Sequence, residues 1–450
     1  MINFNEINKL YFVGIGGISM SGLAKLMLTQ KKEVCGCDDN LTDITKNLTN
    51  LGIIVKKSYY KTGLKNCDLV VYTNAISLNN KNLIEAKKLN KPIIERAEFL
   101  GEITKLYKTN IAVSGTHGKT TTTSMIANIF EFKNPTIHVG GILDGSKSNI
   151  KIGNKQTFIT EACEYNKSFL KLNPTYSIVL NIEKDHLDTY KNLKNLKQSF
   201  FQFIKQTSKK VIINYNILST LPQNFDCSKL ITFSINKQST YVAKNLKSYN
   251  GAYSFDVYKK ENFIGHINLN ILGKHNVLNA LAAISLCFEQ NIPFEIIKDK
   301  LESFKSTKRR FEILYNKDFK VITDYAHHPT EIKASIKTAL SISKNKLICI
   351  FEPHTYSRTI SLFKEFLTCF KGAEKLILLP TYKAREKKIL GGSAYDLYKV
   401  LKQKQAVVYA KNYDACIKLL KKEIEKNNVF LFLGAGTIDN LAREFASKLN

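Results

Sequence analysis

The chain has 450 residues, nine cysteines and a formal net charge of +29. Because this length exceeds what one hydrophobic core usually supports, we expect two or three domains. No apolar run reaches the roughly 18 residues of a membrane-spanning helix, and residues 1–10 lack a signal-peptide pattern, which predicts a cytoplasmic protein without membrane insertion. The cysteines form no CxxC pair, which favours reduced thiols over a disulfide framework or a zinc site.

The excess of positive charge is weak evidence for nucleic-acid binding. The lysines are spread along the whole chain instead of forming one basic block, and only six of the 67 basic residues are arginine. In so lysine-rich a chain, an arginine indicates a position that needs the planar, bidentate guanidinium. The six are Arg96, Arg309, Arg310, Arg358, Arg385 and Arg443.

Short apolar runs alternate with helical stretches from end to end, which predicts an α/β protein with mostly parallel sheets. The predicted strands include 10–13, 68–72, 111–114, 176–180, 321–324, 347–351 and 429–433. Between about 211 and 272, the turn residues Asn250-Gly251 and Gly265 favour inserted antiparallel strands. Predicted helices end near 101–108 and 306–310, each just before a new predicted strand, which divides the chain into three predicted domains, 1–106, 107–308 and 309–450.

A glycine loop follows the first predicted strand. Gly14, Gly16 and Gly17 open a helix, and Asp38 ends the next predicted strand about 22 residues later. This spacing is typical of a dinucleotide-binding loop, in which the helix N-terminus binds a pyrophosphate and the acidic residue meets a ribose hydroxyl. Ser19 stands where the third glycine is expected, so the pattern is imperfect.

The strongest local motif is GTHGKTTTT at 115–123, between a predicted strand and a helix that opens at Lys119. In such a loop, backbone N–H groups point at phosphate oxygens, the lysine reaches the terminal phosphates, and Thr120 offers its hydroxyl to Mg²⁺. Val113 replaces a glycine of the strict Walker pattern, which makes this a shorter GxxGKT form. ATP and Mg²⁺ are therefore the predicted cofactors. The predicted ATP-binding residues of the loop are Gly115, Thr116, His117, Gly118, Lys119, Thr120 and Thr121.

Further motifs follow in order along the chain. They are RAE at 96–98, EACEY at 161–165, NIEKDHLD at 181–188, GKHNVLNA at 273–280, RRFE at 309–312, DYAHHPTE at 324–331 and EPHTYSRT at 352–359. With GTHGKTTTT, this set resembles the Mur ligase family over nearly the whole chain. The loop GIGGISMSGLA at 14–24 is similar to that of the alanine-adding member.

The resemblance implies three domains: an N-terminal Rossmann-like domain that binds a UDP-sugar, a central P-loop-type ATP-binding domain with added antiparallel strands, and a C-terminal Rossmann-like domain that closes over ATP and the amino acid. It implies ligation of L-alanine to the lactyl carboxylate of UDP-N-acetylmuramate through an acyl phosphate, the first peptide step of peptidoglycan precursor synthesis. The implied partners are these two substrates, without nucleic acid, for a monomer or homodimer.

The resemblance also implies roles for individual residues. The implied catalytic residues are Lys119, Glu161 and His186, and Thr120, Glu161 and His186 would hold Mg²⁺. Glu161 and His186 each end a predicted strand, where ligand sites of open α/β sheets lie. Further ATP contacts are implied for His275, Asn276, Asn279 and Arg310. Substrate contacts are implied for Gly14, Gly16, Gly17, Ser19, Ser21, Asp38, Arg96, Glu164, Tyr325, His327, His328, His354 and Arg358.

Some alternatives stay open. Helix capping is the competing role for Glu164 and for the polar residues at 275–279. Thr323, Thr355 and Thr437 depart from the family pattern, so no role is predicted for them. At the level of function, the alternatives are the family member that attaches a whole peptide to the same sugar, an NAD-dependent oxidoreductase, and a basic nucleic-acid-binding protein.

Overall fold

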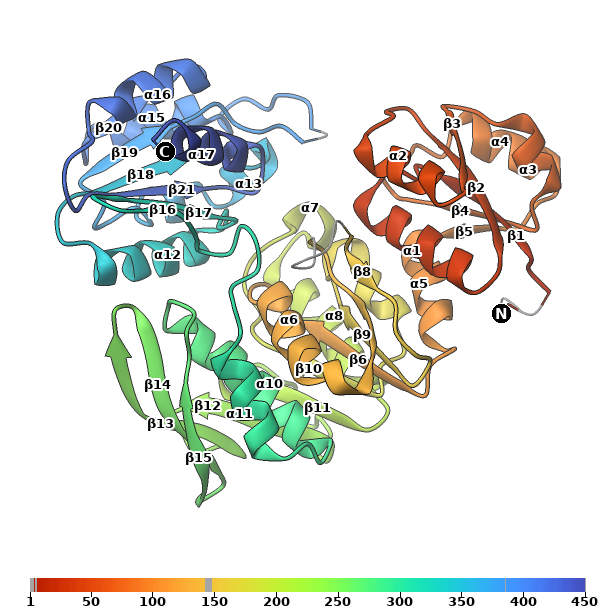
Figure 1. Ribbon diagram of the computed structural model, residues 1–450, viewed down its shortest axis with the longest axis horizontal. Helices are drawn as coiled ribbons and strands as arrows, with labels where there is room; N and C mark the ends of the chain where they lie inside the picture. The colour runs from red at the N-terminus through yellow and green to blue at the C-terminus, as the bar shows by residue number, and fades with distance from the viewer. Residues whose placement is uncertain (1–3, 5, 142–147, 385, 450) are drawn as a thin grey trace.

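The computed structural model describes residues 4, 6–141, 148–384 and 386–449, so Arg385 lies outside the described residues. It consists of three α/β domains, each built on its own sheet, with the red N-terminal and blue C-terminal domains on opposite sides of the central one (Figure 1). The predicted α/β class is confirmed. Each predicted domain boundary falls between two sheets.

The N-terminal domain has a five-stranded parallel sheet in the order β3-β2-β1-β4-β5. Its central strands are apolar on both faces because helices cover the sheet. The chain order reverses beside β1, so the glycine loop after β1 lies at the topological switch point where ligands of such sheets bind. The elements are β1 (Lys9–Val13), α1 (Ile18–Thr29), β2 (Glu33–Asp38), α2 (Asp43–Asn50), β3 (Ile54–Lys57), α3 (Lys61–Asn66), β4 (Leu69–Tyr72), α4 (Lys81–Lys88), β5 (Ile93–Glu95) and α5 (Arg96–Thr104).

The central domain has a ten-stranded sheet in the order β15-β14-β13-β12-β11-β10-β6-β9-β7-β8. The phosphate-binding motif joins β6 to α6, in the parallel part of this sheet. The strands are β6 (Thr109–Ser114), β7 (Thr136–His138), β8 (Ile150–Lys151), β9 (Thr157–Glu161), β10 (Tyr176–Val179), β11 (Lys210–Asn214), β12 (Leu230–Ile235), β13 (Tyr241–Tyr249), β14 (Ala252–Lys259) and β15 (Asn262–Asn268). The helices are α6 (Lys119–Ile129), α7 (Leu187–Tyr190), α8 (Leu193–Gln206), α9 (Tyr215–Leu218), α10 (His275–Glu289) and α11 (Phe294–Glu302), with short 3-10 helices η1 (Glu131–Lys133) and η2 (Tyr165–Lys171).

The predicted antiparallel insertion is shorter than expected. β11 and β12 extend the parallel part of the sheet, and within 211–272 only β13, β14 and β15 pair antiparallel. The turn at Asn250-Gly251 is confirmed between β13 and β14, but Gly265 lies inside β15. A Cβ atom at Gly265 would lie 2.1 Å from the Phe294 ring, so this glycine permits a close helix-to-strand contact and forms no turn.

The C-terminal domain has a six-stranded sheet in the order β16-β17-β21-β18-β19-β20, parallel except for the edge strand β16. Its buried strands β18 and β21 match the predicted ranges. The elements are β16 (Glu312–Asn316), β17 (Lys320–Asp324), α12 (Pro329–Ile342), β18 (Leu347–Phe351), α13 (Tyr356–Ser361), α14 (Phe363–Phe366), β19 (Lys375–Leu378), α15 (Ala394–Leu401), β20 (Val407–Tyr409), α16 (Tyr413–Lys421), β21 (Val429–Leu433) and α17 (Ile438–Ser447).

Two global features agree with the composition. All nine cysteines are free thiols, as predicted, and burial raises the pKa of several of them, for example that of Cys35 to about 12. Within the described ranges, no helix combines the length and the apolar character that crossing a membrane requires.

The N-terminal domain docks on the central domain through α5. Its Phe99 and the central-domain Phe169 belong to one buried apolar cluster, and Lys171 pairs with Glu98 at 2.6 Å. Gly101 is a point of close approach, because a Cβ atom there would lie 2.1 Å from the backbone oxygen of Lys171. The two domains therefore approach at a position that only glycine allows.

This packing reverses the usual effect of an alanine in a helix. Alanine in place of an interior helix glycine normally stabilises by about 1 kcal/mol, whereas overpacking of this kind costs about 1–3 kcal/mol. We expect Gly101→Ala to lower the thermal unfolding midpoint, measured by calorimetry. Lys87→Ala, at an exposed position of α4, is the control and should change stability by no more than about 0.5 kcal/mol. A midpoint at or above that of the wild type in Gly101→Ala would contradict this account of the docking.

Candidate active site

The phosphate-binding loop is shaped by two glycines with positive φ. Gly115 has φ +142° directly after β6, and Gly118 has φ +86° at the N-cap of α6. A Cβ atom at Gly118 would lie 2.5 Å from Oδ1 of Asn279 on α10. α6 begins at Lys119, as predicted, so the N–H groups of its first turn and the positive end of its dipole lie beside the loop. This is the geometry that binds phosphate groups.

Lys119 is held in place by a buried carboxylate. Its Nζ donates to both oxygens of Glu164, at 2.9 and 3.1 Å, and to the backbone oxygen of Gly115. The Glu164 side chain is only 1% exposed. Burial lowers the pKa of Lys119, but the adjacent Glu164 carboxylate outweighs burial and the pKa is raised. Lys119 is therefore a fixed positive charge at the loop, and Glu164 is its partner; the predicted contact of Glu164 with the substrate stays a prediction.

The three predicted metal ligands lie around the same loop. Glu161 ends β9, as predicted, and among the described residues its buried Oε1 has no hydrogen-bond partner. His186 lies 3.8 Å from Oε1 of Glu164, and Thr120 Oγ1 accepts a hydrogen bond from Arg310 at 3.1 Å. A buried carboxylate oxygen left unpaired beside a phosphate-binding loop fits a hard divalent cation, which prefers few protein ligands plus phosphates and water.

The predicted position of His186 at a strand end is wrong. β10 ends at Val179, and His186 is the N-cap of α7 with φ +51°. The seven-residue segment 180–186 is a loop because its polar residues turn toward the C-terminal domain instead of continuing the sheet. Lys184 and Asp185, for example, both contact that domain.

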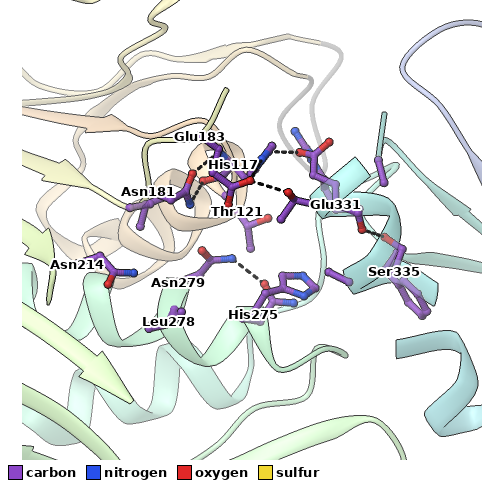
Figure 2. Close-up of a pocket in the computed structure, with 18 of the residues that line it drawn as sticks. His117, Thr121, Asn181, Glu183, Asn214, His275, Leu278, Asn279, Glu331 and Ser335 are labelled. Atoms are coloured by element: carbon purple, nitrogen blue, oxygen red, sulfur yellow. Dashed lines mark hydrogen bonds and ion pairs between the residues drawn. The ribbon is translucent and has the colours of Figure 1, made fainter. Parts of the chain in front are cut away.

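A cavity of about 450 Å³ separates the central and C-terminal domains (Figure 2). Its volume falls in the range of small-molecule sites. Seven of the predicted ATP-binding residues line it, namely His117, Gly118, Thr121, His275, Asn276, Asn279 and Arg310. Figure 2 shows the α10 side chains His275 and Asn279 on one side of this space and Glu331 and Ser335 of α12 across from them.

Sequence reasoning missed several residues of this cavity. They include Asn181, Glu183, Asn214, Asn216, Asp324, Glu331 and Ser335. Asp324 and Glu331 belong to the DYAHHPTE motif, and Asn214 ends β11, so two signals were present in the sequence. Asp324 is partly buried in the cavity wall, and burial raises its pKa although Ser335 donates a hydrogen bond to its carboxylate.

Charged side chains join the phosphate-binding loop to the C-terminal domain. His117 Nδ1 lies 3.1 Å from Glu331 of α12, and its Nε2 lies 3.5 Å from Glu183. Burial lowers the pKa of His117, but these two carboxylates outweigh burial and raise it to about 9. Glu331 also accepts the backbone N–H of His328, the N-cap of α12. The same carboxylate thus caps α12 and holds the loop histidine.

His117, Glu183 and His328 have ligand atoms within 4.8 Å of one another, a spacing that suits a metal ion. However, both ring nitrogens of His328 are already used. Nε2 donates to the backbone oxygen of Lys184 at 3.0 Å, and Nδ1 accepts from the N–H of Thr330 at 3.2 Å. We therefore assign these side chains to the contact between domains.

The C-terminal face groups four of the predicted substrate residues. Arg358 donates to both oxygens of Asp185, at 3.2 and 3.4 Å, and to Nδ1 of His354 at 3.1 Å. Burial raises the pKa of Asp185, but the guanidinium outweighs it and holds the pKa well below its usual range. Burial lowers the pKa of His354 to about 4 and that of His327 to about 3, so both rings are neutral near pH 7. His327 donates from Nδ1 to the backbone oxygen of Tyr325 at 2.9 Å.

The N-terminal glycine loop is held by its own acidic residue. Asp38 accepts the N–H of Gly16 at 2.9 Å, and Gly14 has φ +81°. Ser21 donates to the backbone oxygen of Ile18, within the first turn of α1. Asp38 therefore shapes the loop, and its contact with a ribose stays a prediction. The remaining predicted residues of this region, Gly17, Ser19 and Arg96, lie at the starts of α1 and α5.

Three models of Mur ligase domains match the chain in order. Residues 9–108 match the Mur ligase family catalytic domain, 113–287 the Mur ligase middle domain, and 309–436 the Mur ligase glutamate ligase domain. The chain belongs to the Mur ligase family. The UDP-N-acetylmuramate–L-alanine ligase of Clostridium novyi is 41% identical to this Mur ligase over 455 residues, covering 98% of each chain.

Solved structures agree with this assignment. The UDP-N-acetylmuramate-alanine ligase of Thermotoga maritima is 29% identical, with 98% of this chain and 99% of that chain covered and a TM-score of 0.81. A murein peptide ligase of Psychrobacter arcticus, 21% identical over 98% of both chains with a TM-score of 0.69, shares the fold. The three-domain fold of this Mur ligase is therefore shared with these solved structures.

The three threonines that depart from the family pattern have contacts in this Mur ligase. Thr323 donates to Asp439 at 3.1 Å, and Thr437 donates to Glu352 at 3.1 Å. Thr355 has φ +68° and precedes α13, the helix that carries Arg358. All three contribute to packing within the C-terminal domain.

The raised pKa of His117 predicts a pH-dependent contact between domains. Its folded pKa of about 9 lies above the ordinary 6.5, so the stabilisation is complete below about pH 6.5 and is lost as pH rises through about 9. We expect the free energy of unfolding of the wild type, measured at each pH, to fall toward that of His117→Gln over this range, by at most about 1.4 kcal/mol per pH unit. A difference between the two proteins that stays constant from pH 6 to 10 would rule out this titration.

Proposed function

We propose that this Mur ligase joins L-alanine to the lactyl carboxylate of UDP-N-acetylmuramate at the expense of ATP, the first peptide step of peptidoglycan precursor synthesis. The observation that carries the proposal is the fixed positive charge of Lys119 at a phosphate-binding loop beside the interdomain cavity, with the unpaired Glu161 oxygen nearby. The name and the full-length match of the Clostridium novyi relative support the choice of substrates.

The reaction brings several negative groups together. The carboxylate of the sugar nucleotide attacks the terminal phosphorus of ATP, which gives an acyl phosphate and ADP. The amine of alanine then attacks the acyl carbon, an amide forms, and phosphate leaves. In this site Lys119 and the N–H groups of the loop stabilise the charge on the transferring phosphoryl group. Glu164 keeps Lys119 in position before the nucleotide binds.

Thr120, Glu161 and His186 would hold Mg²⁺, which when bound neutralises charge on the phosphate oxygens. Arg310 reaches Thr120 from the start of the C-terminal domain, so closure of that domain brings a second positive charge to the loop. The adenine and ribose are proposed to occupy the cavity between α10 and α12. The closed domains exclude water, which would otherwise hydrolyse the acyl phosphate.

The amino acid is proposed to bind at the C-terminal face. The guanidinium of Arg358 can hold both oxygens of a carboxylate, a geometry it already shows with Asp185. Nε2 of neutral His327 is left as an acceptor for the amine, because Nδ1 donates to the backbone. We also propose a cytoplasmic location, a monomer or homodimer, and no contact with nucleic acid.

Lys119 is the direct test of the proposal. The wild type should release phosphate from ATP only with Mg²⁺, UDP-N-acetylmuramate and L-alanine present together, and Lys119→Ala should lower this rate by a factor on the order of 10²–10³. The single variant leaves Glu164 buried and unpaired, which costs about 3–5 kcal/mol of stability. Lys119→Ala combined with Glu164→Gln should therefore regain thermal stability without regaining turnover. Phosphate release at the wild-type rate from the double variant would sink the proposal.

Arg358 tests the amino-acid site. Arg358→Lys keeps the charge but loses the bidentate geometry, so the KM for L-alanine should rise about ten- to hundredfold while the KM for ATP changes little. The matched control is Arg443→Lys, because Arg443 pairs with Glu312 and Asp439 within the C-terminal domain. Steady-state kinetics with each substrate varied in turn distinguishes the two. An equal rise of both KM values in Arg358→Lys would indicate a general loss of domain closure instead.

A further inference from the structure

His138 lies at the junction of the N-terminal and central domains. It ends β7 and is 5% exposed. Its Nε2 lies 3.1 Å from Oγ of Ser19, in the first turn of α1, and its Nδ1 lies 3.2 Å from Oγ1 of Thr160. Thr160 directly precedes Glu161, and its hydroxyl is bonded to the backbone oxygen of Glu161 at 3.0 Å. A continuous chain of hydrogen bonds thus runs from the start of α1 to the backbone carbonyl of Glu161, the residue whose carboxylate oxygen is unpaired.

The directions of these bonds follow from the groups involved. The carbonyl oxygen of Glu161 can only accept, so the Thr160 hydroxyl donates its one proton there. Thr160 must then accept from His138, which places the ring proton on Nδ1 and leaves a lone pair on Nε2. Ser19 donates to that lone pair. The arrangement requires a neutral ring, and burial, with Arg96 nearby, lowers the pKa of His138 to about 3.

The surrounding packing leaves little freedom for this chain of bonds to shift. A Cβ atom at Gly22 of α1 would lie 2.3 Å from Oδ1 of Asn149, whose amide in turn donates to the backbone oxygen of Val139, the residue after His138. Helix α1 is therefore in close contact with the β7–β8 region of the central domain. Because no gap separates these elements, a displacement of α1 also displaces His138.

We propose that His138 is a positioning residue that couples the sugar-nucleotide loop to the metal-binding carboxylate, through Ser19 on one side and Thr160 on the other. The inference rests on the proposed function and extends it. Ser19 lies next to the loop that binds the pyrophosphate, and Glu161 lies next to the loop that binds ATP. Because ligation requires the sugar carboxylate and the terminal phosphate to align closely, a fixed link between the two loops contributes directly to that alignment.

Coupling of this kind has a thermodynamic signature. Binding of UDP-N-acetylmuramate should strengthen binding of Mn²⁺, used as a probe for Mg²⁺, and by linkage Mn²⁺ should strengthen binding of the sugar nucleotide by the same factor. We expect a factor of about five or more in the wild-type protein saturated with a non-hydrolysable ATP analogue. In His138→Leu, which removes both hydrogen bonds, the factor should fall to near one. Isothermal titration calorimetry measures both affinities without turnover.

Three further variants separate the two halves of the link. His138→Asn keeps a donor near the Nδ1 position but loses the hydrogen bond with Ser19. Ser19→Ala removes that same hydrogen bond from the other side. Thr160→Val removes the hydrogen bonds between His138 and the backbone of Glu161. Each should abolish the coupling. The first two should mainly weaken binding of the sugar nucleotide and the third mainly binding of Mn²⁺. These milder changes also test the link if His138→Leu fails to fold. His266→Leu, at a half-exposed position of β15 away from all motifs, is the control and should leave the coupling unchanged.

The outcomes distinguish this inference from the proposed function. If the wild type turns over alanine and the sugar nucleotide, but the coupling is equal in the wild type and in all His138 variants, His138 has only a structural role and the inference is overturned. A lower thermal midpoint with intact coupling leads to the same conclusion. If the wild type neither binds the sugar nucleotide nor turns over alanine, the proposed function fails and this inference fails with it.

Discussion

A buried ion pair between Lys119 and Glu164 determines how the rest of the site can be built. Amide formation at the expense of ATP places a carboxylate beside a triphosphate, so a positive charge must be present before either arrives. A lysine alone in a loop would be mobile, whereas here a carboxylate that is 1% exposed accepts two of its hydrogen bonds. Such a pair adds little net stability, because desolvation offsets the attraction. Its contribution is the fixed position of the charge.

The same logic extends to the contacts between domains. His117 with Glu331, Arg358 with Asp185, and Arg310 with Thr120 all join the central domain to the C-terminal one. Each contact involves a residue that is also proposed to meet a ligand, so this arrangement of the two domains and the proposed site are one structural state. Substrates that add charge to this region are therefore expected to change the balance of these contacts.

The sequence predicted the local features well, because strands, the two glycine loops and the start of α6 depend on short-range patterns. What it could not show are partnerships across long separations. Asp185 and Arg358 lie 173 residues apart, and nothing local to either residue indicates the other. The misplaced strand end at His186 has the same origin, since the segment after β10 is drawn out of the sheet by contacts with the C-terminal domain. The overlong antiparallel insertion arose because alternating strands pair in either direction, and only tertiary packing decides which.

The arginines mark positions of this lysine-rich chain that need more than positive charge. The described arginines outside the N-terminal domain all either stack the guanidinium plane on a ring or bind carboxylates through more than one of its N–H groups. Arg358 binds both oxygens of one carboxylate, Arg443 bridges two carboxylates, and Arg309 and Arg310 stack at 4.8 and 4.9 Å on the ring of Tyr325. A lysine ammonium supplies charge but has neither a planar group for stacking nor the paired N–H groups of a guanidinium, so it cannot replace these contacts. A compositional bias that removes arginine wherever charge alone suffices therefore leaves it at positions where geometry matters, and here those positions cluster on the C-terminal domain.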